Sequence, residues 1–273
     1  MPGSGKDGVL RRRGTALSRL LHCDGQPVAV RVVGLRSAIR LHVEAPSRLS
    51  AQEAIERMRF ALGLDHDLRP FHLRFSRDPL LGPVIRRRPW LRPRRRPQPF
   101  EALAWAICEQ LIESERAWEI QRRLVLRFGP RSECGSMRDV PLAPTLAGRA
   151  PAELQACGLS AGRSLAMVKS AREVAAGRAD LAEHESAWRR LRAISGIGSW
   201  TVEKLAFHGQ GRDDQIPAGD LAYVKLVGRL EGLGRRATED EVRAFFSRYE
   251  PYAGLAGIYL LHAAYAGGFG RYG

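Results

Sequence analysis

The stretch LRAISGIGSWTV, residues 191–202, decides the fold. An amphipathic helix is predicted to end at Ile194, and a second helix is predicted to begin near Ser199. Gly196 and Gly198 lie between them and allow a tight turn with close approach to the backbone. The first amide groups of the second helix then point outward at the positive end of its dipole, which can bind a phosphate without any side chain. A plain turn between two helices has the same pattern, so this stretch alone leaves both interpretations open.

A carboxylate follows the hairpin at a fixed distance. Twenty residues after Trp200, a loop containing Pro217 and Gly219 precedes Asp220, where another helix is predicted to begin. The commonest role of Asp at such a place is to cap the helix. A capping carboxylate beside a hairpin that grips DNA could also reach a nucleotide drawn out of the duplex, and the residues alone do not decide between these roles.

Composition agrees with a polyanionic partner. The chain has 44 Lys and Arg residues against 29 Asp and Glu residues, a formal net charge of +15. Such an excess strengthens binding to nucleic acid through phosphate contacts and counterion release. Arginine dominates over lysine, which can reflect genomic composition, so the charge supports a nucleic-acid partner without establishing it.

Several protein classes are excluded by the same sequence. A chain of 273 residues with 44% hydrophobic residues can bury a substantial core. No apolar run reaches the roughly 18 residues of a membrane helix, and residues 1–21 lack the apolar core of a signal peptide. We therefore expect no membrane partner and a cytoplasmic, nucleoid-associated location. The four cysteines, Cys23, Cys108, Cys134 and Cys157, have no CxxC spacing, so we expect reduced thiols and no metal site.

The first ninety residues predict a small α+β unit on an antiparallel sheet. Val28 to Val33 is β-branched and apolar, and Ile39 to Glu44 alternates as a half-buried strand does. Gly34 lies between these runs, as a hairpin requires. A capping box at Ser50 and Glu53 predicts that a helix follows. Residues 71–75 alternate again and predict another strand.

A segment rich in arginine and proline separates this unit from the rest. Residues 86–99 contain seven arginines and four prolines, and the prolines forbid a regular helix. The run from Arg86 to Arg96 is either a solvated linker or a linker that also touches phosphates. After Pro99 the pattern is helical, with helices predicted near residues 151–157, 161–176, 186–194, 199–208, 220–230, 239–248 and 252–265.

The predicted fold class is therefore α+β, with a small N-terminal antiparallel-sheet domain followed by a mostly α-helical body. The boundaries that we predict are a basic, poorly ordered lead-in at 1–20, the sheet domain at 21–88, the Arg/Pro linker at 89–99 and the helical domain at 100–273.

The hairpin together with its spaced aspartate resembles the helix-hairpin-helix (HhH-GPD) superfamily of DNA glycosylases. Other segments look like the alkylpurine branch of that superfamily, and the likeness covers roughly residues 25–265. The segments that look like this branch are Pro99 to Leu103, Glu109 to Leu111, Leu154 to Ala166 and Pro251 with Tyr252. The resemblance implies a monomer that acts on double-stranded DNA containing damaged bases. It implies no cofactor, although carbonyl groups of the hairpin can hold a structural monovalent cation in this family.

Roles follow from the matching positions. Asp220 matches the catalytic carboxylate. The backbone clamp on phosphate matches Gly196, Ile197, Gly198, Ser199 and Thr201. Leu111, with Gln110 beside it, matches the wedge that fills the gap left by a flipped base; a helical Leu is otherwise a core residue.

Trp200 stands where the branches that also cut the DNA backbone carry a lysine, so the resemblance implies a monofunctional enzyme. Base-pocket candidates are Trp105, Trp200, Lys204, Tyr223 and Tyr259. Three positions depart from the aromatic residues of the branch: Lys204, Leu221 and Leu261. Lys204 would repel a cationic base unless Glu203, Glu109 or Asp220 offsets its charge. The resemblance to the alkylpurine branch, despite these departures, implies excision of alkylated purines of the 3-methyladenine and 7-methylguanine class. A glycosylase for deaminated or oxidised bases and a non-catalytic DNA-binding protein are the alternatives.

Overall fold

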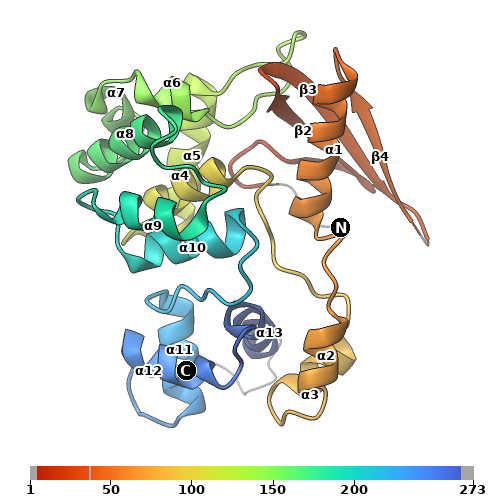
Figure 1. Ribbon diagram of the computed structural model, residues 1–273, viewed down its shortest axis with the longest axis vertical. Coiled ribbons are helices and arrows are strands. Elements are labelled where there is room, and N and C mark those ends of the chain that lie inside the picture. Colours follow the sequence, from red (N-terminus) through yellow and green to blue (C-terminus); the bar gives the residue numbers. More distant parts are fainter. Residues whose placement is uncertain (1–4, 37, 266–273) are drawn as a thin grey trace.

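The computed structural model describes residues 5–36 and 38–265. Its N-terminal part is a four-stranded antiparallel sheet in the order β1-β2-β3-β4, and helices make up the rest (Figure 1). The strands are β1 (Arg11–Arg13), β2 (Ala16–Cys23), β3 (Gln26–Gly34) and β4 (Ile39–Glu44). The predicted α+β class, with the sheet first and the helical body after it, is confirmed.

The sheet begins earlier than we predicted. Residues 11–13 and 16–20 belong to strands, so the expectation of a poorly ordered lead-in over residues 1–20 is wrong for this part; residues 1–4 lie outside the described part of the chain. β2 pairs with β3 from Ala16 opposite Val33 to Cys23 opposite Gln26. The reason is the run of apolar residues from Ala16 onward, which is buried against the rest of the protein.

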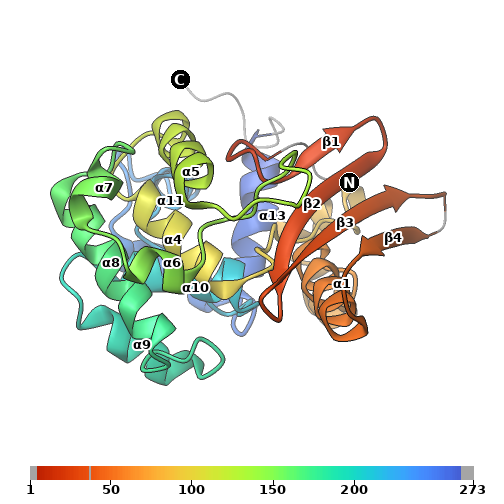
Figure 2. The same cartoon turned by 90° about the horizontal axis from the view of Figure 1, so that it is seen from above.

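Helix α1 (Arg48–Leu62) covers one face of the sheet. Ala54 and Met58 pack with buried residues of β2 and β3 in a separate hydrophobic core. The helix is capped by Ser47 and Ser50, whose side chains and backbone groups bond reciprocally, rather than by the predicted Ser50 and Glu53. Figure 2 shows the sheet and α1 together on one side of the helical body.

The strand predicted over residues 71–75 is wrong, because this segment lies within α2 (Arg69–Phe75). Phe71 and Phe75 are one helical turn apart and are both buried, whereas Leu73 between them is 81% exposed. Three apolar residues at alternate positions thus fit a helix with one buried face as well as a strand. Helix α3 is Leu81–Arg87, and it packs on the last helix of the chain.

The helical body has two hydrophobic cores. The first joins helices α4 (Pro99–Glu109), α5 (Ser114–Phe128), α6 (Ala143–Ala147), α7 (Pro151–Gln155), α8 (Ala161–Ala175), α9 (His184–Arg192) and α10 (Ser199–Gly209). The second joins α2 and α3 with α11 (Leu221–Leu230), α12 (Glu239–Ser247) and α13 (Ala253–Tyr265). The helices predicted after residue 150 are confirmed. The segment between α10 and α11 passes from one core to the other, and Asp220 ends it (Figure 1).

The Arg/Pro segment is partly solvated and partly folded into the body. Residues 86–88 are exposed. Arg95 forms an ion pair with Asp213 (3.0 Å), and Arg96 forms one with Asp7 (3.2 Å). The second half of the segment is therefore a structural connection, and contact of this segment with phosphates stays a prediction.

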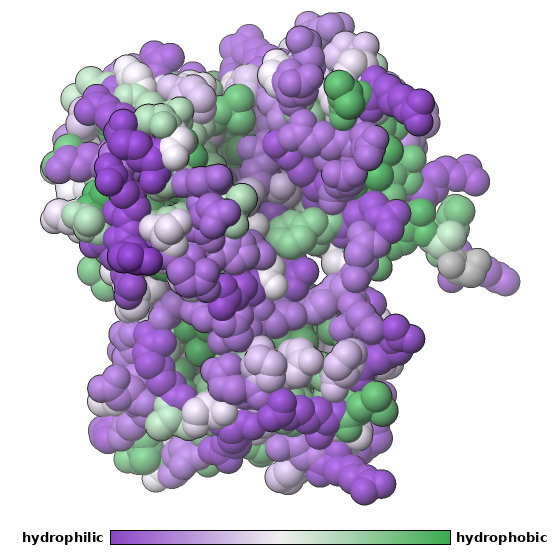
Figure 3. Space-filling view, viewed as in Figure 1, coloured by the Kyte–Doolittle hydropathy of each residue, from purple (hydrophilic) through white to green (hydrophobic). Residues whose placement is uncertain are grey.

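Hydrophilic side chains cover most of the face seen in Figure 3, with smaller areas of hydrophobic residues between them. Within residues 5–36 and 38–265, none of the helices combines the length and the apolar character needed to cross a bilayer.

Candidate active site

The hairpin between α9 and α10 presents bare backbone to solvent. Gly196 has φ of +89°, a left-handed conformation that favours glycine, and Gly198 precedes the first residue of α10 without any side-chain cap. Ile197 between them is only 4% exposed and anchors the hairpin in the first core. The first amide groups of a helix have no partner inside it, so those of α10 are available to an anion.

Gln110 and Thr201 hold the hairpin in place. The Nε2 atom of Gln110 donates to the Gly196 carbonyl oxygen (2.7 Å) and to the Thr201 hydroxyl (2.8 Å). The Thr201 side chain is 2% exposed. These contacts give both side chains a role inside the protein, whereas the sequence led us to expect them at the DNA. Phosphate binding by the backbone amide of Thr201, in the first turn of α10, stays a prediction.

Leu111 is exposed. Its relative exposure is 104%, and its φ of +53° lies in the left-handed region that a leucine rarely adopts. A large apolar side chain is thus held out in solvent directly after α4, at a cost in conformational strain. The alternative interpretation of Leu111 as a core residue does not fit this placement.

Asp220 caps helix α11 and remains accessible. Its Oδ1 atom accepts from the amide of Ala222 (3.0 Å), and its side chain is 26% exposed. The preceding Gly219 lies against α10: a Cβ atom there would come within 3.9 Å of Trp200 Cδ1. The loop therefore packs beside Trp200, and the Asp220 carboxylate at its end lies 3.9 Å from Lys204 of the same helix, so segments twenty positions apart in the sequence are neighbours in space.

A network of charges fixes this loop to α10 and α12. Glu203 accepts from the amide of Ala218 (3.3 Å) and from Arg243 (2.6 Å). Arg243 also donates to Glu239 (2.5 Å), which accepts from the Ser199 hydroxyl (3.1 Å). Burial raises the pKa of Glu203 despite its pairing with Arg243. Glu203 thus positions the loop, and its carboxylate is not the one that offsets Lys204.

Lys204 lies one helical turn after Trp200, between two carboxylates. Its Nζ atom is 2.9 Å from Glu109 Oε2, 3.9 Å from Asp220 Oδ2 and 5.2 Å from the centre of a Trp200 ring. Burial, the largest single effect, favours the neutral form of Glu109, but the charge and hydrogen bond of Lys204, together with Arg96 and His208, lower the pKa of Glu109 on balance. Glu109 is therefore the residue that offsets the lysine charge.

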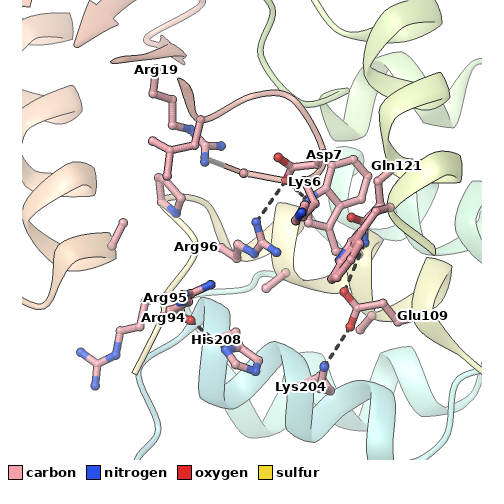
Figure 4. Close-up of a pocket in the computed structure, with 18 of the residues that line it drawn as sticks. Lys6, Asp7, Arg19, Arg94, Arg95, Arg96, Glu109, Gln121, Lys204 and His208 are labelled. Atoms are coloured by element: carbon pink, nitrogen blue, oxygen red, sulfur yellow. Dashed lines mark hydrogen bonds and ion pairs between the residues drawn. The ribbon is translucent and has the colours of Figure 1, made fainter. Parts of the chain in front are cut away.

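A cavity of about 550 Å³ opens beside this pair (Figure 4). Its walls come from the N-terminal segment, β2, α1, the Arg/Pro segment, α4, α5 and α10. Among the lining residues are Lys6, Asp7, Arg94, Trp105, Glu109, Trp118, Gln121, Lys204 and His208. Figure 4 shows Glu109 and Lys204 pointing toward each other across its edge. A cavity of this size can accommodate a small planar ligand.

His208 belongs to this cavity and was missed by sequence reasoning. It lies two turns after Trp200 on the same face of α10, and that spacing is the signal that could have found it. Its Nδ1 atom is 2.8 Å from the Arg94 carbonyl oxygen, to which it can only donate. Burial, with the nearby Lys204 charge, lowers the pKa of His208 to about 4. The imidazole is therefore neutral at pH 7, and its other nitrogen is an acceptor.

The remaining predicted pocket residues divide into two groups. Trp105 lines the cavity and donates through Nε1 to Asp7 (3.1 Å). Tyr223 and Tyr259 are 3% and 0% exposed and belong to the second core, where the Tyr259 hydroxyl donates to the Leu91 carbonyl oxygen (3.1 Å). The structure therefore does not bring these two tyrosines to the cavity beside Lys204, because their rings fill the core between α11, α13 and α2.

Among the residues that the structure describes, no three His, Cys, Asp or Glu side chains gather in a way that could hold a metal ion. A monovalent cation at the hairpin would be bound by carbonyl oxygens instead, and it stays a prediction.

Comparison with known proteins connects this geometry to a family. No family model matches the chain. The DNA-3-methyladenine glycosylase of Bacillus subtilis is 26% identical over 209 residues, which are 74% of this chain and 69% of the relative. DNA-3-methyladenine glycosylase 1 of Schizosaccharomyces pombe is 31% identical over 172 residues, which are 60% of this chain and 71% of the relative.

Solved structures show the same fold. A 3-methyladenine DNA-glycosylase from Archaeoglobus fulgidus superposes with a TM-score of 0.79 at 23% identity, covering 93% of this chain and 88% of that one. A 3-methyladenine DNA glycosylase of Schizosaccharomyces pombe in complex with abasic DNA has a TM-score of 0.58 at 26% identity, covering 69% of this chain and 93% of that one. With the hairpin and the aspartate in place, the chain belongs to the helix-hairpin-helix superfamily of DNA glycosylases.

Proposed function

We propose that this protein is a monofunctional DNA glycosylase of base excision repair, of the 3-methyladenine DNA glycosylase II type. It hydrolyses the N-glycosidic bond of alkylated purines, the 3-methyladenine and 7-methylguanine class, after they flip out of the duplex. The observation that carries the proposal is the accessible Asp220 carboxylate, which ends the loop packed beside Trp200 and lies 3.9 Å from Lys204, a residue of the cavity wall. The names of the sequence relatives support the substrate class.

The groups act at different stages. The amides at the start of α10 bind a backbone phosphate, and exposed Leu111 enters the gap left by the extruded nucleotide. Flipping costs a few kcal/mol, which these contacts offset. As the base departs, positive charge develops on the sugar, and ionised Asp220 stabilises it and orients water. A non-catalytic binding protein would need neither this carboxylate nor the cavity.

The charges of the site suit a cationic base. The two carboxylates near Lys204, those of Glu109 and Asp220, together outweigh its single positive charge. Trp200 offers an aromatic ring on which a cationic, π-deficient purine can stack. The direct test is a set of duplexes, each with one lesion: 3-methyladenine, 7-methylguanine, a deaminated base or an oxidised base. Excision confined to the last two would contradict the proposed substrate class.

The product of the reaction is expected to be an intact strand with an abasic site. Trp200 supplies no amine, and the nearby amine of Lys204 is engaged by Glu109 at 2.9 Å. Borohydride should therefore trap no covalent complex between the enzyme and lesion DNA. A trapped complex that disappears in Lys204→Ala would show a lyase step and overturn the monofunctional assignment.

Gly198→Val is expected to weaken DNA binding. Gly198 has φ of −97°, and a Cβ atom added to it would meet no described atom within 4 Å, so valine fits the fold. Its methyl groups would shield the amides of α10 from phosphate. Loss of one hydrogen bond to a charged group, about 1.5–3 kcal/mol, corresponds to roughly 10- to 100-fold in affinity.

Fluorescence anisotropy with undamaged and abasic duplexes measures this effect, and both affinities should fall together. Gly148→Val is the matched control, because Gly148 ends α6 with φ of −85° and has comparable space around it. A folded Gly198→Val variant with unchanged affinity would contradict a phosphate clamp at this hairpin.

A further inference from the structure

Lys204 lies where the glycosidic bond of a bound nucleotide would be. In the proposed function, on which this inference rests, Asp220 lies beneath the sugar and the Trp200 ring lies along the base. The Lys204 ammonium is 3.9 Å from that carboxylate and 5.2 Å from that ring. It is therefore placed at the junction of sugar and base, within reach of a purine nitrogen that flanks the bond to be broken.

The lysine is fixed in this place by a carboxylate that has no other function in the proposed reaction. Glu109 Oε2 is 2.9 Å from Lys204 Nζ, and Glu109 Oε1 accepts from Gln121 Nε2 (3.2 Å). Both Lys204 and Glu109 are mostly buried, with side-chain exposures of 18% and 23%. An ammonium group held by a buried carboxylate on one side keeps its remaining hydrogens directed toward the space between Asp220 and the cavity.

Two arginines of the cavity wall are paired with carboxylates away from Asp220. Arg96 pairs with Asp7 and Glu101, at 3.2 and 3.3 Å, and Arg95 pairs with Asp213. His208 is neutral, because burial lowers its pKa to about 4. Among the cavity residues whose ion pairs are described, Lys204 is the cation that also contacts the catalytic carboxylate.

The chemistry of the departing base gives this ammonium a purpose. A purine alkylated at a ring nitrogen is cationic and departs as a neutral base, so it needs no proton. A neutral purine departs with an extra electron pair, and a hydrogen-bond donor or proton source at one of its ring nitrogens lowers that barrier. An ammonium at this position therefore serves neutral purine lesions.

We propose that Lys204 is the general acid for the departing base when that base is a neutral purine with an unsubstituted ring nitrogen, such as the deaminated base hypoxanthine. The bond between the sugar C1′ and the base nitrogen breaks, and its electron pair goes to the base. Lys204 gives a proton to a ring nitrogen of that base. Water forms the new bond to C1′, and its proton passes to Asp220 and from there to Lys204, which restores the ammonium.

The test compares one neutral and one cationic substrate in the same enzyme. Single-turnover excision rates are measured on duplexes with hypoxanthine and with 7-methylguanine, for the wild type and for Lys204→Met. The ratio of the hypoxanthine rate to the 7-methylguanine rate should fall about 100-fold in the variant, since general acids contribute roughly 10²- to 10⁴-fold. Glu109→Gln should lower the ratio in the same direction and by less.

Lys169→Met is the matched control, because Lys169 is exposed on α8 and is not among the residues that line the cavity. It should leave the ratio unchanged. Affinity for abasic DNA reports whether each variant is folded, and Lys204→Gln replaces Lys204→Met if the latter is not.

The outcomes separate this inference from the proposed function. A wild type that excises 7-methylguanine but not hypoxanthine overturns the role of Lys204 and leaves the proposed function standing. The reverse preference overturns the alkylpurine assignment, while the effect of Lys204→Met on hypoxanthine still tests the acid. Equal losses on both substrates would show that Lys204 only supports the structure, and a wild type inactive on both would overturn both proposals.

Discussion

Asp220→Asn is expected to abolish excision while DNA binding persists. Asparagine has the shape of aspartate, and its side-chain oxygen can still accept from the Ala222 amide, so helix α11 should begin as before. What disappears is the negative charge beside the sugar. Electrostatic groups of this kind contribute several kcal/mol to the transition state, which corresponds to a loss of about 10²-fold or more in rate.

Single-turnover excision of 7-methylguanine measures the loss, and anisotropy with abasic DNA shows that binding persists. Asp78→Asn is the matched control: Asp78 also accepts from amides at a helix start, those of Leu80 and Leu81 at 2.9 and 2.8 Å. The control should excise at the wild-type rate. If Asp220→Asn does so as well, Asp220 is only a helix cap.

The largest loss of stability is expected from Arg19→Met. Arg19 is 4% exposed and lies in β2, and its Nη2 atom is 2.5 Å from Glu101 Oε2 in α4 and 3.8 Å from Asp139. Burial raises the pKa of Glu101 even with Arg19 beside it. Without Arg19 this buried carboxylate keeps only the longer contact with Arg96. Breaking a buried pair by removing one partner typically costs about 3–5 kcal/mol of unfolding free energy.

Urea unfolding measures the change. Arg59→Ala is the control, because Arg59 pairs with Asp65 at the surface, where such pairs contribute about 0–1 kcal/mol. A loss below about 1 kcal/mol in Arg19→Met would mean that the sheet and α4 do not depend on this contact, contrary to the argument from buried pairs.

Much of the fold could be predicted because its signals are local. The hairpin glycines and the apolar periods of the later helices each lie within one short segment, so the local sequence is sufficient to predict them. The strand predicted over residues 71–75 failed because Phe71, Leu73 and Phe75 fit two periods, and only packing against α13 selects the helix. The first strands were missed because the arginines of β1 precede the apolar residues of β2 and look like a solvated tail.

The candidate site divides in the same way. The placement of Asp220 next to Trp200 follows from a turn that the sequence indicates. The sequence does not show which aromatic side chains face the cavity. Tyr223 and Tyr259 lie on helices, and the direction of their rings depends on packing against α12 and α2. The N-terminal segment contributes Lys6 and Asp7 to the cavity wall, where Asp7 contacts Trp105, 98 positions later in the sequence. No local sequence pattern predicts such a contact.

Helix α10 fixes the spacing of the residues of the candidate site. Its first turn carries the amides proposed to bind phosphate, and Trp200, Lys204 and His208 follow at intervals of one turn along one face. Each turn advances about 5.4 Å, so the helix sets the spacing between these amides and the three side chains. One residue inserted after Trp200 would rotate the later two side chains by about 100° away from the cavity. Substitutions at position 200, 204 or 208 can therefore change the substrate range of such an enzyme without changing the backbone amides proposed to bind DNA.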